Sequence, residues 1–573
     1  MINSPAKPSL SFFWINLRPF KKWLIVVMLI VFIDSLLAGM GVGIILPMIQ
    51  TLLEQNPSKL LIVKIFPSLA GMSIQHRILV VSAITFVLFL SRFVIGLLRV
   101  GLVKSFAEKL RRFWSCKIGE NIVHGPYQYY IEKPQGAWLN DWLTEPISAS
   151  AFCINYINYM SSITTFIILM FLGVMISWKV MLSVSIVLIL ILFLVRKFTQ
   201  KSAIEHSRNK SKVIQRLSSL VNECLTHIKD IKTLNAENHS LGKISDQFDT
   251  LRNILVKAQI YAELPRLSGE LFASILISIS LIYLSYTSEL KMEDFLPFLA
   301  FYTVLIYRLI TSSMGVMTSR IKAFQEFHSL VKVQSLSSNF LPHNRSDDGL
   351  DFDAILTDIS FNNVEFGYNS KVNVIRGANF ILHRGKLTVL SGKSGHGKTT
   401  LIDLLLRLIA PQAGKIEVNN LNIMEFNLAH WRKCFGYVSQ DAALFHGSIL
   451  ENLTIGLPEV SQAEIERSCE MAGCLDFISG LPANFNTMVG ERGLSLSGGQ
   501  RKRIAIARAL LRKPQFLILD ETTTSFEISI EKEILYNLRN KIPKMAIVLI
   551  SHRVNDDYQP DYIITIDKGI VVA

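Results

Sequence analysis

The stretch L-T-V-L-S-G-K-S-G-H-G-K-T-T, from Leu387 to Thr400, decides the fold of the C-terminal part of this chain. Leu387–Ser391 is apolar enough to form a buried strand, and Thr399–Ile409 has the pattern of an amphipathic helix. Between them, Gly392–Thr399 fits G-x-x-x-x-G-K-[ST], a loop whose backbone N–H groups wrap phosphate. Strand, loop and helix together predict an α/β domain that binds a nucleotide.

The residues expected to contact the nucleotide are those of the loop and of the first turn after it. They are Gly392, Lys393, Ser394, Gly395, His396, Gly397, Lys398, Thr399 and Thr400. Lys398 can reach the β- and γ-phosphates, and the Thr399 hydroxyl can ligate Mg²⁺.

A second strand, F-L-I-L-D from Phe516 to Asp520, ends in a pair of acidic residues. Asp520 is placed to hold Mg²⁺, directly or through water. Glu521 is placed to orient and deprotonate an attacking water molecule. An acidic helix cap is the alternative for an isolated Asp-Glu pair, but a phosphate loop and a four-residue apolar run precede this one.

The composition indicates a second, membrane-embedded part. Of the 573 residues 50% are hydrophobic and 18% are charged, and the mean hydropathy is +0.36, which is rare for a wholly soluble protein. The net charge of +14 lies entirely in residues 1–350, because residues 351–573 contain 24 basic and 24 acidic residues. Basic excess confined to the apolar part is typical of membrane-flanking loops, so membrane insertion is favoured over nucleic-acid binding.

Residues 24–336 are predicted to form a transmembrane domain of six helices, each long enough to cross a hydrocarbon core of about 30 Å. The spans are expected near residues 24–53, 78–103, 150–178, 180–197, 270–288 and 295–317. Residues 1–23 are predicted to be an N-terminal interfacial helix, because aromatic and basic side chains alternate there. Residues 337–350 are predicted to be a linker to the domain at 351–573.

The charges of the loops predict the orientation in the membrane. Residues 1–23 carry four Lys and Arg, residues 104–149 carry six and residues 196–266 carry thirteen, whereas the intervening turns are poor in basic residues. By the positive-inside rule, both termini, the two long polar segments and the nucleotide-binding domain are cytoplasmic. The chain is thus predicted to be a multi-pass protein of the cell membrane.

Three charged residues, Asp34, Arg92 and Arg308, interrupt the apolar spans. A charge at the centre of a membrane helix costs ~2.5–3.5 kcal/mol on insertion scales. We expect these side chains to face the bundle interior or a wet cavity. They form either a polar patch on a substrate path or an internal ion pair, or, for the arginines, they extend to the cytoplasmic interface.

The motifs that follow the phosphate loop resemble those of the nucleotide-binding domain of ATP-binding-cassette (ABC) transporters. Leu496–Gln500 reads L-S-G-G-Q, the full signature of that family. The resemblance implies that Tyr368, in V-E-F-G-Y, stacks on adenine, and that Gln440, in Y-V-S-Q-D, assists Mg²⁺ binding and catalysis. It implies that His552, in L-I-S-H-R, contacts the γ-phosphate. It also implies that ATP and Mg²⁺ are the cofactors.

Six spans ahead of one nucleotide domain resemble a half-size exporter. The resemblance implies a multidomain membrane protein, in which an all-α six-helix transmembrane domain with long cytoplasmic helical extensions precedes an α/β P-loop NTPase domain. In this family the signature residues, here Ser497, Gly498, Gly499 and Gln500, contact ATP held by the partner chain. A homodimer is expected because this chain supplies every element of a site; a heterodimer with a degenerate partner is the alternative.

The expected function is ATP-driven export or flipping of an amphipathic substrate (a lipid, a lipid-linked sugar or a hydrophobic compound) across the cytoplasmic membrane. A peptide or bacteriocin exporter, a soluble ATPase, and an ATP-gated membrane channel or regulator are the alternatives. The sequence departs from the family at T-S-F-E, where Glu527 replaces the aspartate of S-A-L-D. This leaves the coupling between two paired sites open.

Overall fold

The chain divides into two compact units, which are described separately. The computed structural model describes residues 18–53, 67, 71–176, 178–287, 292–338, 349–350, 356–368, 373–457, 459–490, 496–520, 528–551 and 558–572. The first unit comprises Met1–Gly125 and Tyr130–Leu341, and the second comprises Pro126–Tyr129 and Pro342–Ala573. Most of the predicted interfacial helix and of the predicted linker lies outside the described residues.

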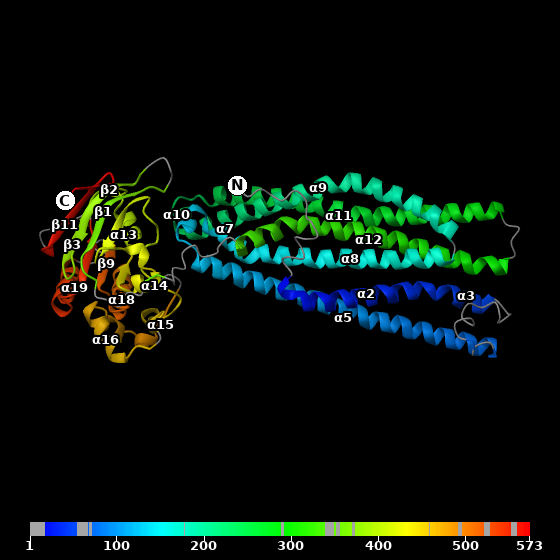
Figure 1. Ribbon diagram of the computed structural model, residues 1–573, viewed down its shortest axis with the longest axis horizontal. Helices are drawn as coiled ribbons and strands as arrows, with labels where there is room; N and C mark the ends of the chain where they lie inside the picture. Colours follow the sequence, from blue (N-terminus) through cyan, green and yellow to red (C-terminus); the bar gives the residue numbers. More distant parts are fainter. Residues whose placement is uncertain are drawn as a thin grey trace. The chain divides into compact units, whose positions relative to one another are not determined.

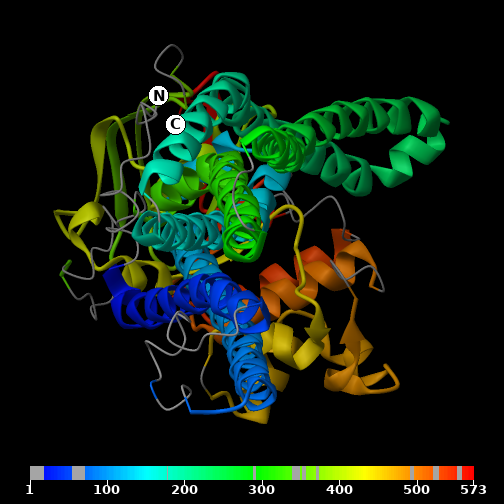
Figure 2. The same cartoon turned by 90° about the vertical axis from the view of Figure 1, so that its right-hand side faces the viewer.

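The described part of the first unit is helical, with long helices that lie side by side (Figure 1). Its elements are η1 Arg18–Phe20, α2 Lys21–Gly43, α3 Ile45–Leu53, α5 Ile74–His124, α6 Gln128–Glu132, α7 Gln135–Leu139, the π-helix η4 Asn140–Thr144, α8 Glu145–Ile176, α9 Trp178–Thr226, α10 Ile228–Thr233, α11 Glu237–Thr287 and α12 Met292–Ser338. Viewed along the bundle, the blue pair α2 and α5 lies on one side of it (Figure 2).

Four helical segments of the described chain are long and apolar enough to cross a membrane. They are Lys21–Thr51, Ile74–His124, Gln135–Ile176 and Leu299–Ser337, which cover the predicted first, second, third and sixth spans. The side chains of much of residues 180–197 and 279–288 lie outside the described set. The fourth and fifth spans therefore remain predictions.

Large apolar side chains hold the helices of the first unit together. Phe106 and Leu110 of α5 are fully buried in one cluster with Val27 of α2 and Phe152 of α8. In its second half, α5 has buried residues at positions 103, 106, 110, 114, 118 and 122, which are three or four residues apart, as expected for one face of a helix.

Asp34 forms the internal ion pair that was one of its two expected roles. Its Oδ2 lies 3.0 Å from Nη1 of Arg99 on α5, and the same Nη1 donates to Oγ of Ser161 on α8 at 2.9 Å. Its partner, Arg99, was not among the charged residues that the sequence indicated. Arg92 and Arg308 form no ion pair with any carboxylate of the described residues.

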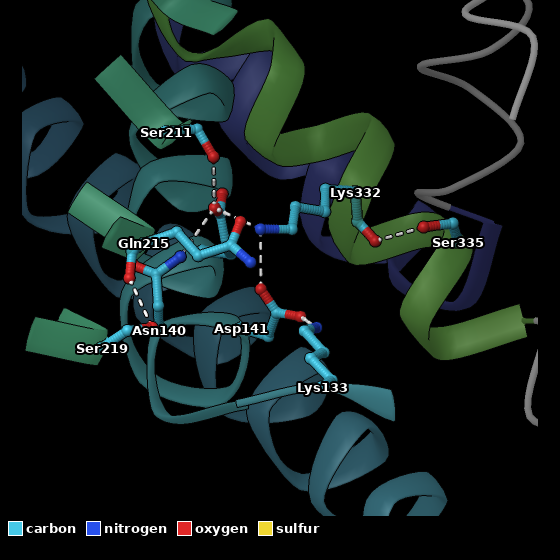
Figure 3. A network of polar contacts seen from close by, with 9 residues as sticks. Lys133, Asn140, Asp141, Ser211, Gln215, Ser219, Lys332 and Ser335 are labelled. Atoms are coloured by element: carbon cyan, nitrogen blue, oxygen red, sulfur yellow. Dashed lines mark hydrogen bonds and ion pairs between the residues drawn. The ribbon is translucent and has the colours of Figure 1, made fainter. Parts of the chain in front are cut away.

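A second polar network joins η4 and the start of α8 to α9 and α12 (Figure 3). Nζ of Lys332 lies 2.7 Å from Oδ1 of Asp141 and 3.0 Å from Oε1 of Glu145. Asp141 also pairs with Lys133, and Ser211 of α9 donates to Glu145 at 2.7 Å. Two buried carboxylates and two ammonium groups thus neutralise one another where the π-helix η4 runs into α8.

The second unit is the predicted α/β domain (Figure 1). Its strands are β1 Ile359–Phe366, β2 Ile375–Leu382, β3 Leu387–Ser391, β4 Ala413–Val418, β5 Leu421–Asn422, β6 Phe435–Val438, β7 Gly447–Ser448, β8 Met488–Val489, β9 Phe516–Asp520, β10 Ala546–Ile550, β11 Tyr562–Asp567 and β12 Ile570–Val572. Its helices are α13 Lys398–Leu405, η6 Ile423–Glu425, α14 Leu428–Lys433, α15 Ile449–Thr454, α16 Gln462–Met471, α17 Leu475–Ser479, η7 Asn484–Asn486, α18 Gly498–Leu511 and α19 Ile528–Lys541.

The main sheet has the strand order β12-β11-β3-β10-β9-β6, in which every pair is parallel except β11 with β12. Its central strands β3, β9 and β10 are buried on both faces, as parallel strands under helices usually are, whereas β11 and β12 at one edge are partly exposed. Side chains alternate between two cores: Leu517 and Leu519 of β9 enter one, and Phe516 and Ile518 enter the other. The smaller antiparallel sheet has the order β2-β1-β4-β5.

The helix after the phosphate loop is shorter than the sequence predicts. It was expected to reach Ile409, but α13 ends at Leu405. Arg407 takes a left-handed conformation with φ 51° and donates from Nη1 to the carbonyl of Phe426 at 2.7 Å. The leucine pattern continues past this point because Leu406 and Ile409 still enter the core from the turn.

Candidate nucleotide-binding site

The carboxyl ends of the parallel strands bring the predicted site residues to one edge of the main sheet. Leu390 of β3 is in register with Ile550 of β10, and Ile550 is in register with Asp520 of β9. Val438 of β6 pairs with Leu519 of β9, and Gln440 follows Val438 by two residues. Gln440 therefore lies just past the carboxyl end of β6, at the same edge. In open α/β sheets this edge is where ligands bind.

The phosphate loop leaves β3 and enters α13, as predicted. Gly392, Gly395 and Gly397 have φ values of 146°, 78° and 103°, which side chains rarely adopt. A Cβ on Gly392 would lie 2.3 Å from the carbonyl oxygen of Ile566, so only glycine lets the chain turn here. The loop residues Lys393, Ser394 and Gly395 are exposed, which leaves room for phosphate.

Lys398 is the first residue of α13, and its side chain lies along the loop. Its Nζ donates to the carbonyls of Gly392 at 2.7 Å and Lys393 at 3.1 Å, and the residue is 5% exposed. A buried ammonium held among carbonyls is a fixed positive charge inside an anion cradle. Thr399, next in the chain, is exposed at the same helix start.

His396 closes the outer side of the loop. Its Nδ1 accepts from the backbone N–H of Lys568 at 3.1 Å and lies 3.2 Å from Oδ1 of Asp567. These contacts connect the loop to the β11–β12 turn.

Tyr368 stands beside the loop at the end of β1. Its hydroxyl lies 3.3 Å from Oγ1 of Thr400, its ring meets Phe366 edge to face at 5.1 Å, and burial raises its pKa. Gln412 holds the preceding backbone with two hydrogen bonds to Gly367, at 3.1 and 2.8 Å. A ring that is 38% exposed and fixed in this way offers a face for stacking. Sequence reasoning did not identify Gln412.

Asp520 has two polar neighbours that sequence reasoning also missed. The hydroxyl of Tyr437 on β6 donates to Oδ2 of Asp520 at 3.2 Å, and burial followed by the charge of Asp520 raises the pKa of that phenol. Burial and the same charge raise the pKa of Asp403 on α13 from 3.8 to about 6. Asp403 lies one turn after Thr399, on the same helix face. Excess negative charge beside a threonine hydroxyl is a donor set that Mg²⁺ fits.

Two of the predicted catalytic residues lie outside the described residues. Glu521 directly follows Asp520, and His552 directly follows Ser551, whose N–H donates to the carbonyl of Leu390 at 3.2 Å. Gln440 is described and exposed, just past the end of β6. Their roles remain predictions from the sequence.

The signature residues begin helix α18. Ser497 Oγ accepts from the N–H of Gln500 at 3.2 Å, and Gln500 Oε1 accepts from the N–H of Ser497 at 2.9 Å, which is a capping box. Within the described chain, no hydrogen bond or ion pair joins Ser497–Gln500 to the phosphate loop. The two anion-binding motifs of this chain therefore do not meet through direct polar contacts.

Comparison with known proteins agrees with this geometry. The family profile of the ABC transporter matches residues 375–524, and that of the ABC transporter transmembrane region matches residues 24–309. The chain is similar to an export ATP-binding/permease protein of Rickettsia conorii, with 29% identity over 91% of this chain and 92% of the relative. It is also similar to a multidrug resistance ABC transporter ATP-binding and permease protein of Lactococcus lactis, with 28% identity over 82% of this chain and 79% of the relative.

Among solved structures, a bacterial Atm1-family ABC exporter with ATP bound has the same fold. The TM-score is 0.78 at 20% sequence identity, and the match covers 97% of this chain and 95% of that one.

Proposed function

The chain belongs to the ABC transporters as a half-size exporter with an ATPase coupled to export, and from this premise we propose that it exports or flips an amphipathic substrate across the cytoplasmic membrane. The substrate classes we propose are a lipid, a lipid-linked sugar or another hydrophobic compound. The observation that carries this proposal is the sheet edge, where the phosphate loop, Asp520 and the end of β6 converge, in a chain whose described residues include four membrane-length helices. Those helices exclude a soluble ATPase.

We propose that the loop residues bind the phosphates of ATP and that Tyr368 stacks on its adenine. Lys398 keeps a positive charge at the β- and γ-phosphates. Thr399, Gln440 and Asp520 would hold Mg²⁺, which neutralises phosphate charge during transfer to water. Glu521 orients and deprotonates the attacking water, and His552 contacts the γ-phosphate.

We propose that two copies of the chain pair head to tail, so that the signature of one completes the site of the other. The start of α18 supports this, because Ser497 is exposed and the N–H groups of Gly498 and Gly499 have no partner among the described residues. The positive start of α18 in one copy and the positive start of α13 in the other would repel each other. An anion bound between them removes this repulsion. ATP would then close the dimer, and hydrolysis would reopen it.

The proposed arrangement in the membrane keeps the boundaries given by the sequence. Residues 24–336 span the membrane with six helices, and residues 351–573 and both termini face the cytoplasm. The loop charges support this orientation. The short helix α10, between α9 and α11, lies in His227–Asn238, a segment that resembles a coupling helix of ABC exporters.

Substitution of Glu521 by Gln tests the proposed chemistry. Loss of a general base slows turnover by about 10²–10⁴-fold, while the phosphate loop should still bind ATP. Glu533→Gln, on the exposed side of α19, is the matched control and should hydrolyse ATP like the unchanged chain. Undiminished hydrolysis by the Glu521 variant would refute the assignment.

Substitution of Ser497 by Ala tests the signature. It removes one cap of a capping box, and Ser461→Ala removes the equivalent cap at α16. Each change should cost about 1 kcal/mol of stability. ATP hydrolysis should fall only for Ser497→Ala, and an equal fall in both variants would mean that Ser497 acts only as a cap.

A further inference from the structure

A polar layer crosses the first unit where α2, α5, α8 and α12 approach one another. Asp34 and Arg99 neutralise each other there, and Arg99 also donates to Ser161 at 2.9 Å. The carbonyl of the next residue, Ser162, accepts from Oγ of Ser312 on α12 at 3.1 Å. The layer therefore ties α5, α8 and α12 together by short contacts.

Two further guanidinium groups lie on the same helix faces as this layer. Arg92 precedes Arg99 by two turns on α5, and Arg308 precedes Ser312 by one turn on α12, so each pair shares a face. A helix rises about 1.5 Å per residue, which places Arg92 about 10 Å and Arg308 about 6 Å from the layer along their helices.

Both arginines lie on the same side of the layer, because α5 and α12 run in the same direction (Figure 1). The carboxyl ends of the two helices meet where Nδ2 of Asn121 donates to the carbonyl of Leu336 at 2.9 Å.

Neither arginine has a counter-charge within the described chain. The carboxylate of Asp34 already pairs with Arg99, and no other described carboxylate lies within ion-pair distance of Arg92 or Arg308. Two like charges inside apolar helices are unfavourable unless an anion joins them. Arg308 is exposed and Arg92 is half-buried in the single chain, so both remain accessible to one.

The surroundings indicate what kind of anion fits. The planar guanidinium matches phosphate with two parallel hydrogen bonds. Beside the arginines, Phe93 and Tyr307 are 63% and 45% exposed, and they offer apolar contact to hydrocarbon. We propose that Arg92 and Arg308 bind the phosphate head group of an amphipathic substrate. This inference rests on the proposed export function and specifies the charge class of its substrate.

The test is direct binding of a fluorescent phosphatidic acid to the purified full chain in neutral detergent, followed by anisotropy. Chain-matched phosphatidylcholine and glycerol 3-phosphate serve as competitors. We expect phosphatidic acid to compete at least tenfold better than either. The variants are Arg92→Gln and Arg308→Gln, the double lysine variant R92K/R308K, and Arg112→Gln as an exposed control on α5 outside the predicted span.

Each glutamine variant should lose at least tenfold in affinity for phosphatidic acid, whereas the double lysine variant should lose less than either glutamine variant, because it keeps both charges but not the two parallel hydrogen bonds of each guanidinium. Arg112→Gln should bind like the unchanged chain. A lysine variant as weak as the glutamine variants, or an equal loss in Arg112→Gln, would overturn the proposal. Equal competition by glycerol 3-phosphate would overturn the assignment to an amphiphile.

Hydrolysis of ATP by the unchanged chain, measured in the same preparation, separates this inference from the proposed function. If hydrolysis is absent, the proposed function fails. If hydrolysis is normal but phosphatidic acid has no advantage over phosphatidylcholine, only the phosphate site fails.

Discussion

Replacement of Lys332 by Met should loosen the packing of α12 against η4 and the start of α8, which the network in Figure 3 holds together. The side chains of Asp141 and Glu145 are 0% and 3% exposed, and Lys332 contacts both. Without its ammonium, Asp141 keeps its ion pair with Lys133, whereas Glu145 is left with uncharged donors such as Asn140 and Ser211 and with no ion pair among the described residues. Removal of one partner from a buried ion pair costs ~3–5 kcal/mol, and the 19% exposure of Lys332 favours the lower end.

A loss of about 3 kcal/mol corresponds to roughly a hundredfold faster amide exchange in the affected segment. The assay is hydrogen–deuterium exchange with mass spectrometry on the full chain in lipid nanodiscs, with peptides that cover residues 135–149. Lys104→Met is the matched control, because Lys104 and Glu108 form an exposed pair at 3.7 Å. Exposed pairs contribute ~0.2–1 kcal/mol, so exchange there should change by less than about fivefold.

A second substitution distinguishes lost pairing from lost packing. In the double variant K332M/E145Q, the pair of Asp141 with Lys133 stays intact and the new amide can still accept from Ser211. Replacement of a whole buried pair is often close to neutral, so exchange should return to within about tenfold of the unchanged chain. An increase below tenfold in Lys332→Met, or a double variant that exchanges faster than the single one, would refute the reasoning.

Three further predictions concern the second unit. Gly392→Ala should weaken ATP binding at least tenfold in a fluorescent-nucleotide titration, because its Cβ would lie 2.3 Å from a strand carbonyl; Gly480→Ala, whose nearest neighbours are at 3.6 Å, should not. The carboxyl of Asp403 has a pKa raised from 3.8 to about 6 by burial and by Asp520, so its ionisation destabilises the fold as pH rises through that window. Without nucleotide and with EDTA, the melting temperature of Asp403→Asn minus that of the unchanged chain should therefore rise between pH 4 and 7 and stay constant at higher pH. A difference that does not change with pH would contradict this. Gln412→Ala removes two hydrogen bonds to Gly367, the residue before Tyr368, and should weaken ATP binding about tenfold. An unchanged affinity would show that these hydrogen bonds are not needed to position Tyr368.

Local patterns predicted the centre of the nucleotide-binding domain because each is complete within a few residues. The strands β3 and β9 have the predicted bounds, Leu387–Ser391 and Phe516–Asp520, since a short apolar run followed by Gly or Asp marks the buried length and the carboxyl end of a parallel strand. The predicted end of α13 was wrong because it depends on a contact with a segment that is distant in the sequence. A buried hydrogen bond from Arg407 to a distant loop ends that helix, and the leucine pattern does not contain this information.

Contacts between distant segments were not predictable from one sequence. Lys332 and Glu145 meet although 187 residues separate them. The partner of Asp34 lies near the predicted end of the second span, where a basic residue is ordinary. The choice of Arg99 depends on the close approach of α2 to α5, where Oδ1 of Asp34 lies 4.0 Å from the position that a Cβ on Gly96 would take.

The signature illustrates how one motif has a local and an intermolecular meaning. Capping boxes begin α15, α16 and α18 alike, so Ser497 and Gln500 alone mark only a helix start. What differs in α18 is that Gly498 and Gly499 occupy its first two positions, at a cost of about 0.5–1 kcal/mol each relative to alanine where a helix is fully formed. The N–H groups of these glycines are not shielded by side chains, and no partner among the described residues accepts from them. This helix start keeps two destabilising glycines although its capping box is complete. Its N–H groups are suited to an anion brought from outside the chain. The pair of glycines, more than the cap, therefore argues for a site shared by two copies.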